Sequence, residues 1–259
     1  MKNFCLFIGY PRSGSTVLSR ILDMHPNIGI AHEHNVFRDK DIGYLFTSLL
    51  NKMYYTKSLD GLDVIGSKSD YKTLKFFIDN PSYKLSYFKN MIDMPLKILH
   101  IINDPYDNIS TWSNAERNRK GFNQSDDLKD KIKIYKQLNK EIEKLIKKED
   151  VLSIRMDDLI EHPGATLVSI YNHLEVGYDK QIMIKAKSMV HKRPKVTKHD
   201  IKWRQTERFE LKRFIDETDF LNGYKFEKDE DKILAEKAKE MEKKQKKYDE
   251  KMKKKKEKK

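Results

Sequence analysis

The sequence predicts a three-layer α/β sandwich, in which a central, mostly parallel β-sheet is flanked by helices. Short apolar runs at 4–8, 96–102 and 151–154 have the length and composition of buried strands. Stretches with apolar residues at helical spacing separate these runs. Strands that alternate with helices in this way are typical of a parallel sheet.

The chain is expected to open with a strand, a loop and a helix. The strand covers 4–8, and a loop containing Gly and Pro follows it directly. His25-Pro26-Asn27 should end the helix, and 28–30 should form a short second strand. The helix is predicted from apolar residues at steps of three or four, namely Val17, Leu18, Ile21, Leu22 and Met24.

The later elements repeat this pattern. Val64-Ile65 predicts a short strand, and the strand over 96–102 should end at Asn103-Asp104-Pro105. A long amphipathic helix is expected over 126–148. The strand over 151–154 should lead into a helix that starts at Met156. The basic, irregular segment 191–208 is interpreted as a surface loop that leads to a helix over 205–216.

The charge is distributed unevenly along the 259 residues. The net charge of +13 favours anionic partners. Residues 228–259 hold 15 Lys and 9 acidic residues, so this tail supplies six of those charges. We expect one domain over 1–227 and a Lys/Glu-rich tail, helical or disordered, over 228–259.

The single cysteine and the apolar runs indicate the cellular compartment of the protein. Cys5 lies inside an apolar run and is expected to be a small buried hydrophobe, so no disulfide framework forms within one chain. The apolar run over 4–8 is too short for the core of a signal peptide. No stretch approaches the roughly 20 apolar residues of a membrane span. We expect a cytoplasmic protein without a membrane partner.

The loop after the first strand carries the strongest chemical signal. Gly9-x-x-x-x-Gly14-Ser15-Thr16 has the glycine spacing of a phosphate-binding loop, whose backbone N–H groups and helix N-terminus attract phosphate. Its place between a strand and a helix predicts a P-loop-like fold. An ATPase or GTPase loop needs Lys where Ser15 stands, whereas the cation here is Arg12. A tight turn with a helix cap is the alternative.

Residues 10–16, Tyr-Pro-Arg-Ser-Gly-Ser-Thr, resemble the first motif of the sulfotransferases that use 3′-phosphoadenosine 5′-phosphosulfate (PAPS). The resemblance implies that Arg12 touches the transferring sulfuryl group. It also implies that the loop holds the 5′-phosphate through Pro11, Arg12, Ser13, Gly14, Ser15 and Thr16.

Residues 103–111, Asn-Asp-Pro-Tyr-Asp-Asn-Ile-Ser-Thr, are similar to the family's second motif, which holds the 3′-phosphate. Asn103, Ser110 and Thr111 are the implied contacts. Asn103 stands where Arg is usual and Thr111 where Ser is usual, and Ser110, Arg117 or Arg119 are candidates to compensate for the missing charge. A helix N-cap after a strand is the alternative interpretation.

Two further segments extend the resemblance over about residues 3–208. Residues 153–163 are similar to the family's Arg-Tyr-Glu-Asp-Leu segment, with Met156 in place of an aromatic. Residues 191–203, with Lys198 and Trp203, are similar to the basic loop that covers the nucleotide.

Sulfuryl transfer needs an in-line acceptor, a base for its proton and cations for the developing charge, but no metal. By resemblance to protein-tyrosine and many bacterial sulfotransferases, Glu33 is the general base. His32 and His34 are its rivals. A metal site or a plain surface loop are alternatives for this His-Glu-His run. Lys68 resembles the family's lysine that stabilises the departing phosphate oxygen, and an ordinary surface lysine is the alternative.

The function expected is transfer of a sulfuryl group from PAPS to a hydroxyl or amine, which leaves 3′,5′-adenosine bisphosphate (PAP). The acceptor is a small molecule, a carbohydrate or a peptide. A P-loop kinase using ATP and Mg²⁺ is one alternative. A non-catalytic basic protein that binds nucleic acid is the other, although the tail lacks interleaved aromatic residues for stacking.

Overall fold

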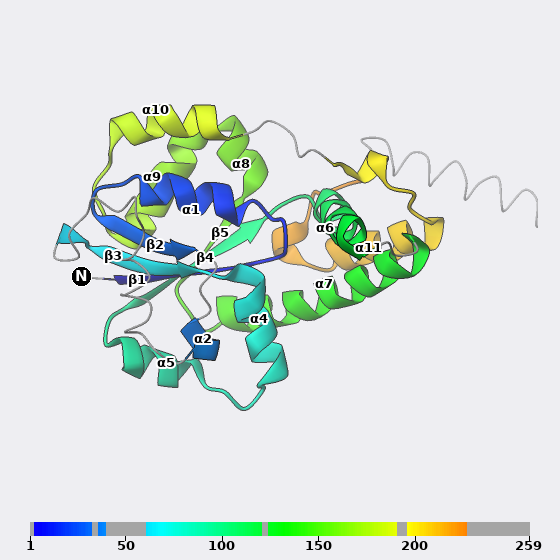
Figure 1. Cartoon of the computed structure of the whole chain (residues 1–259), viewed down its shortest axis with the longest axis horizontal. Helices are drawn as coiled ribbons and strands as arrows, with labels where there is room; N and C mark the ends of the chain where they lie inside the picture. The colour runs from blue at the N-terminus through cyan, green and yellow to red at the C-terminus, as the bar shows by residue number, and fades with distance from the viewer. Residues whose placement is uncertain (1–2, 33–35, 40–60, 121–123, 191–195, 227–259) are drawn as a thin grey trace, which may run out of the picture. The chain divides into compact units, whose positions relative to one another are not determined.

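A computed structural model describes residues 3–32, 36–39, 61–120, 124–190 and 196–226 (Figure 1). Its sheet has five strands in the order β2-β3-β1-β4-β5, and every neighbouring pair is parallel. The strands are β1 (Asn3–Gly9), β2 (Ile28–His32), β3 (Val64–Lys68), β4 (Leu96–Ile102) and β5 (Val151–Arg155).

Helices connect the strands along the chain. Between β1 and β4 lie α1 (Ser15–Asp23), α2 (Val36–Asp39), α4 (Asp70–Asp79) and α5 (Leu85–Ile92). Between β4 and β5 lie α6 (Pro105–Lys120) and α7 (Gln124–Ile146). After β5 come α8 (Met156–Glu161), α9 (Pro163–Leu174), α10 (Lys180–Met189), the short 3-10 helix η2 (Lys198–Asp200), α11 (Gln205–Asp216) and the 3-10 helix η3 (Asp219–Leu221).

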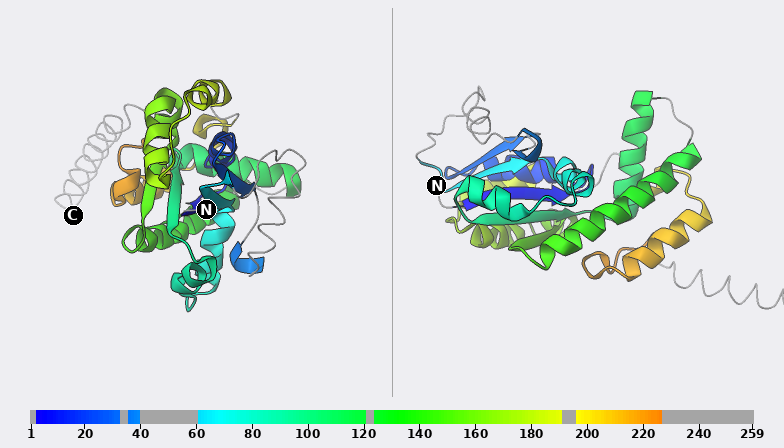
Figure 2. Two further views of the ribbon diagram at one scale, coloured as in Figure 1. Left: turned by 90° about the vertical axis from the view of Figure 1, so that its left-hand side faces the viewer. Right: turned by 90° about the horizontal axis from the view of Figure 1, so that it is seen from below.

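The helices form a layer on each face of the sheet. Figure 1 shows α1, α9 and α10 on one side of the strands and α4 and α7 on the other. Figure 2, seen from below, shows α7 running beneath the sheet with α11 beside it, and these two helices are in contact. The predicted three-layer α/β sandwich with a parallel sheet is confirmed.

The central strand is the best buried part of the fold. All residues of β1 are buried because strands flank it on both edges, α4 and α7 cover one face, and Cys5 and Phe7 on the other face pack with residues of α1 and α9. Cys5 is completely buried, as predicted, and burial raises the pKa of its thiol well above the ordinary value. The thiolate form is therefore suppressed, and Cys5 acts as a core residue.

The observed boundaries follow the sequence pattern closely. The helix predicted over 126–148 spans Gln124–Ile146, and the helix predicted over 205–216 spans Gln205–Asp216. The strand beginning at Val64 is longer than expected and includes Lys68 as its last residue. Lys68 therefore lies at the carboxyl end of β3 and not in the loop after it.

The chain divides into a compact unit over 1–222 and a second unit over 223–259. Only residues 223–226 of the second unit are described, so the predicted tail over 228–259 lies outside the described residues. Within the described part of the chain, no helix combines the length and hydropathy needed to cross a membrane.

Replacing Gly66 by alanine is expected to lower the free energy of unfolding by about 1–3 kcal/mol. A Cβ on Gly66 would lie 2.5 Å from the backbone oxygen of Cys5, which cannot retreat without disturbing the sheet. The matched control is Gly164→Ala in α9, where the nearest atom is the mobile methyl of Met183 at 3.5 Å. Urea unfolding of both variants checks this, and equal stability losses would contradict it.

Candidate functional site

The donor loop, defined here as residues 9–16, begins with a tight turn. Ser13 N–H donates to the Tyr10 carbonyl at 3.2 Å, which closes a four-residue turn. Arg12, in the third position, has φ 69°. With Pro in the second position, a positive φ in the third is the mark of a type II turn. The only other described non-glycine residues with positive φ, Asp93 and Glu175, are helix C-caps.

Tyr10 anchors this turn to the core. Its buried ring stacks on Tyr135 of α7 with a centroid distance of 4.1 Å. Its hydroxyl donates to the side-chain oxygen of Asn139 at 2.7 Å. Arg12, two residues further on, is exposed. The turn therefore presents a charged side chain from a rigid base.

Gly14 links the turn to α1 and needs to be glycine. Its φ of 96° lies in the left-handed region, and a Cβ there would meet the Met156 sulfur at 2.8 Å. Helix α1 begins at the next residue, so its positively polarised N-terminus faces the loop. Ser13 and Ser15 are buried here, whereas Thr16 is exposed. A helix N-terminus after a glycine-containing turn is an arrangement that binds anions.

The second motif follows β4, the neighbour of β1. Asp104 accepts hydrogen bonds from the backbone N–H of Tyr106 at 2.8 Å and of Asp107 at 3.3 Å. Asp104 is thus the N-cap of α6, with Pro105 as the first helical residue. The helix-cap interpretation is confirmed for Asp104. Asn103 lies before it, and its side-chain oxygen accepts from the Asp104 N–H at 2.9 Å.

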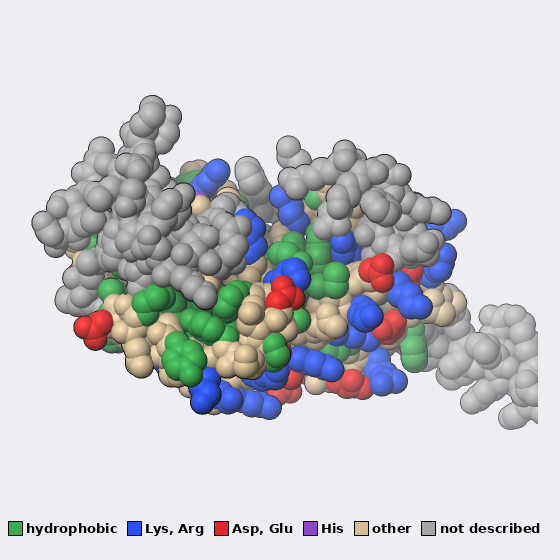
Figure 3. Space-filling view, turned by 60° about the horizontal axis from the view of Figure 1, so that its bottom comes forward, with side chains coloured by type: hydrophobic (Ala, Val, Ile, Leu, Met, Phe, Trp, Pro, Cys, Tyr) green, Lys and Arg blue, Asp and Glu red, His purple; other side chains and the backbone are tan. Residues whose placement is uncertain are grey.

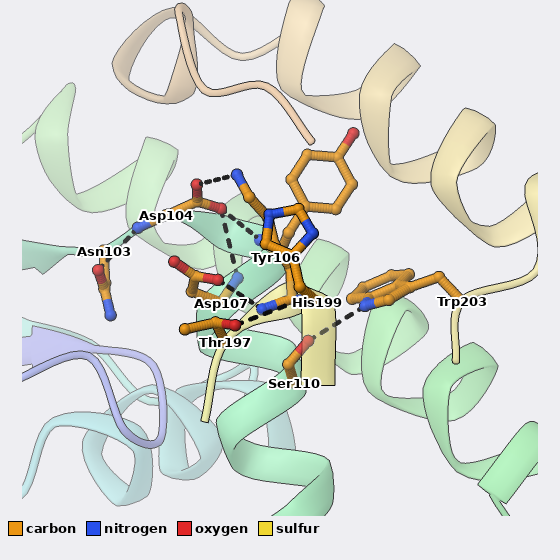
Figure 4. Close-up of polar contacts among 9 residues, drawn as sticks. Asn103, Asp104, Tyr106, Asp107, Ser110, Thr197, His199 and Trp203 are labelled. Carbon is orange, nitrogen blue, oxygen red and sulfur yellow. Dashed lines mark hydrogen bonds and ion pairs between the residues drawn. The ribbon is translucent and has the colours of Figure 1, made fainter. Parts of the chain in front are cut away.

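A segment between α10 and α11 covers this helix start (Figure 4). The Lys198 ammonium pairs with Asp104 at 2.8 Å, and its backbone N–H donates to Asp107 at 2.6 Å. Burial raises the pKa of Asp107, the Asp104 carboxylate raises it further, and the Lys198 N–H opposes the shift. We call residues 196–203 the cover segment.

The hydroxyls predicted to hold the 3′-phosphate contact the cover segment. Ser110 accepts from the Trp203 indole N–H at 3.1 Å (Figure 4). Thr111 donates to the Val196 carbonyl at 2.9 Å. Sequence reasoning gave Ser110 and Thr111 as phosphate contacts and did not foresee their bonds to this segment.

Lys68 and His32 lie at the other side of β1. They are register partners at the carboxyl ends of β3 and β2, and the Lys68 side chain is buried. The Ser19 hydroxyl bonds the Thr16 carbonyl, so its oxygen accepts from the Nδ1–H of His32 at 3.1 Å. The other ring nitrogen faces Asp23 at 3.6 Å. Both nitrogens of His32 are therefore directed toward α1. Glu33 and His34 lie outside the described residues.

The two motifs meet at the point in the sheet where the order of the strands reverses, between β1 and β4. After β1 the chain leads to β2 and β3 on one side, and after β4 it leads to β5 on the other. Ligands of open α/β sheets bind at the carboxyl ends of the strands beside such a switch point. Here Asn108 of α6 donates to the Pro11 carbonyl at 2.9 Å and joins the two segments directly. Sequence reasoning missed Asn108, whose signal was a polar residue on the buried side of a helix.

Within the described part of the chain, no group of three His, Cys, Asp or Glu side chains is placed to hold an ion. On the side shown in Figure 3, Lys and Arg alternate with Asp and Glu. The ion pairs on α7 and α11 include Lys136–Glu210, Lys144–Glu141 and Lys212–Asp216.

Comparisons with known proteins identify the fold. No family profile and no curated protein sequence matches the chain. Solved structures do match. The sulfotransferase domain of the Synechococcus PCC 7002 olefin synthase has a TM-score of 0.55 at 15% identity, over 82% of this chain and 92% of that one. A sulfotransferase from Alicyclobacillus acidocaldarius has a TM-score of 0.52 at 14% identity, over 83% and 91%.

A mouse sulfotransferase complexed with PAP has a TM-score of 0.51 at 12% identity, over 84% of both chains. The chain therefore has a sulfotransferase-like α/β fold.

Proposed function

We propose that this protein is a sulfotransferase that moves the sulfuryl group of PAPS to an acceptor hydroxyl or amine. One observation carries the proposal. The two segments that resemble the donor motifs, residues 10–16 and 103–111, follow the neighbouring strands β1 and β4 of a sulfotransferase-like sheet. They meet at its switch point through the bond between Asn108 and Pro11.

The donor loop suits the 5′-phosphosulfate. Backbone N–H groups and the N-terminus of α1 attract the phosphate, and Arg12 is the one charged side chain of the loop. The hydroxyls of Ser13, Ser15 and Thr16 add further donors. That a structural neighbour was solved with PAP supports the choice of donor.

The 3′-phosphate would lie against the start of α6. Asn103 offers an amide there in place of the guanidinium usual in the family, while Ser110 and Thr111 are tied to the cover segment. Recognition of this phosphate by Asn103 lacks the positive charge and the bidentate geometry that a guanidinium supplies.

Two cations and a base share the work of the chemical step. Arg12 and Lys68 stabilise the charge that develops on the sulfuryl group and on the departing phosphate oxygen. Glu33 accepts the proton of the acceptor as the acceptor attacks in line. His32 is the weaker candidate because Ser19 and Asp23 engage its two ring nitrogens. The acceptor is a small molecule, a carbohydrate or a peptide.

Titration with PAP should stabilise the protein, whereas ATP with Mg²⁺ should not. Ligand that binds the folded state at 100 times its dissociation constant raises the unfolding free energy by about 2.7 kcal/mol. Thermal unfolding with each nucleotide measures this, and adenosine 5′-monophosphate is the control that lacks the 3′-phosphate. Stabilisation by ATP with Mg²⁺ alone would favour a kinase and overturn the proposal.

A further inference from the structure

Asn108 is a polar side chain where helix packing favours an apolar one. It lies in the first turns of α6 and is fully buried. Asparagine is a poorer helix former than leucine, and burying an amide is unfavourable unless it is hydrogen-bonded. The reason for Asn108 must therefore lie in what its side chain binds.

The amide of Asn108 binds the peptide group between Pro11 and Arg12. Its nitrogen donates to the Pro11 oxygen at 2.9 Å, across 97 residues of sequence. A carbonyl oxygen only accepts, so this contact fixes which end of the amide faces the loop. Pro11 occupies the second position of the turn from Tyr10 to Ser13. The bonded carbonyl is therefore the central carbonyl of that turn.

The direction of this carbonyl distinguishes the two common turn types. Types I and II differ chiefly by a flip of the central peptide plane, and proline suits the second position of both. Type I accepts most residues in the third position, whereas type II requires a positive φ there and favours glycine or asparagine. Arg12, with φ 69°, is thus held in the form that an arginine disfavours.

We propose that Asn108 is a positioning residue that holds the donor loop in its type II form. The inference rests on the proposed function, since it assigns the reason why Arg12 is placed as it is. In a trans peptide the C=O and N–H point in opposite directions. Pinning the Pro11 oxygen toward α6 keeps the Arg12 N–H on the opposite side. Without the bond, the peptide between Pro11 and Arg12 flips and the turn becomes type I. The Arg12 N–H and guanidinium then leave the positions that they hold in the type II turn.

The test is a double-mutant cycle between Asn108→Leu and Arg12→Gly. Leucine has a similar size and suits a helix, so the variant should fold. In the natural background Asn108→Leu should lower kcat by about 100-fold, the scale of a small misplacement of a catalytic group. It should also weaken PAP binding by about 10-fold, measured by calorimetry. With Arg12→Gly present, the same change should alter PAP binding less than about 3-fold, because glycine adopts a positive φ freely.

The matched control is Thr73→Val in α4, which also replaces a buried polar group by an apolar one of similar size. The Thr73 hydroxyl is buried without a hydrogen-bond partner in the described structure. This variant should leave kcat and PAP binding unchanged. Equal weakening of PAP binding by Asn108→Leu in both backgrounds, or an unchanged kcat, would overturn the inference.

A protein that binds no PAP at all would refute the proposed function without deciding the role of Asn108. The cycle is then read from the unfolding midpoint in urea. Asn108→Leu should lower that midpoint more when residue 12 is arginine than when it is glycine. Equal shifts would show that Asn108 does not select the turn.

Discussion

Replacing Arg12 by alanine is expected to lower kcat by about 10²–10³-fold, the usual loss when one group that stabilises transition-state charge is removed. Arg12 is the one charged side chain in residues 10–16, and it stands exposed on a turn that Tyr10 anchors to α7. Its charge stabilises mainly the transition state of sulfuryl transfer, and not bound PAPS. The KM for PAPS should therefore change much less than kcat in steady-state assays.

Two companion variants make this result specific. Arg12→Lys keeps the charge and should recover part of the rate, although an ammonium lacks the planar fork of a guanidinium. Arg20→Ala removes an exposed arginine from the last turn of α1 and should leave the rate unaffected. If Arg12→Ala turned over as fast as Arg20→Ala, Arg12 would have no role in the transfer.

Replacing Glu33 by glutamine is expected to lower kcat by about 10²–10⁴-fold, the range for loss of a general base. Glutamine keeps the size of the side chain but cannot take the acceptor's proton. PAP binding should remain within about 2-fold of the natural protein, because proton transfer plays no part in it. The acidic limb of the pH–rate profile should also disappear in the variant, since that limb reports protonation of the base.

His32→Gln is the comparison that separates the neighbouring candidates. Ser19 and Asp23 bind the ring of His32. The main effect of His32→Gln should therefore be a lower free energy of unfolding, with the acidic limb of the pH–rate profile retained. Loss of that limb in His32→Gln, with Glu33→Gln still active, would transfer the role of base to His32.

Much of the fold follows from local sequence patterns. The buried strands are continuous apolar runs, and α7 keeps a clear apolar stripe, so their positions are determined by residues near each other in the chain. The extent of β3 was not predictable in this way. Its last residues, Gly66 to Lys68, are strand because they pair with β2 and β1, and no apolar run marks them.

The same contrast between local patterns and contacts of distant segments applies to the site. The donor loop was visible because glycine spacing and a cation lie within a few residues. Its link to Asn108 was not, because only the folded sheet brings β1 and β4 together. The cover segment was seen as a basic loop, but its bonds to Asp104 and Asp107 depend on where that loop docks on α6.

The position of β1 in the sheet has a consequence for assembly during synthesis. Its partners are β3 and β4, and both follow it by many residues in the chain. Pairing of such distant segments is slow, because the chain must lose the entropy of closing long loops before the stabilising contacts can form. The donor loop belongs to the earliest strand yet takes its final form only after α6 supplies Asn108. An incomplete chain that ends before α6 is therefore expected to expose β1 and to lack nucleotide affinity, so binding competence cannot arise before translation has passed that helix.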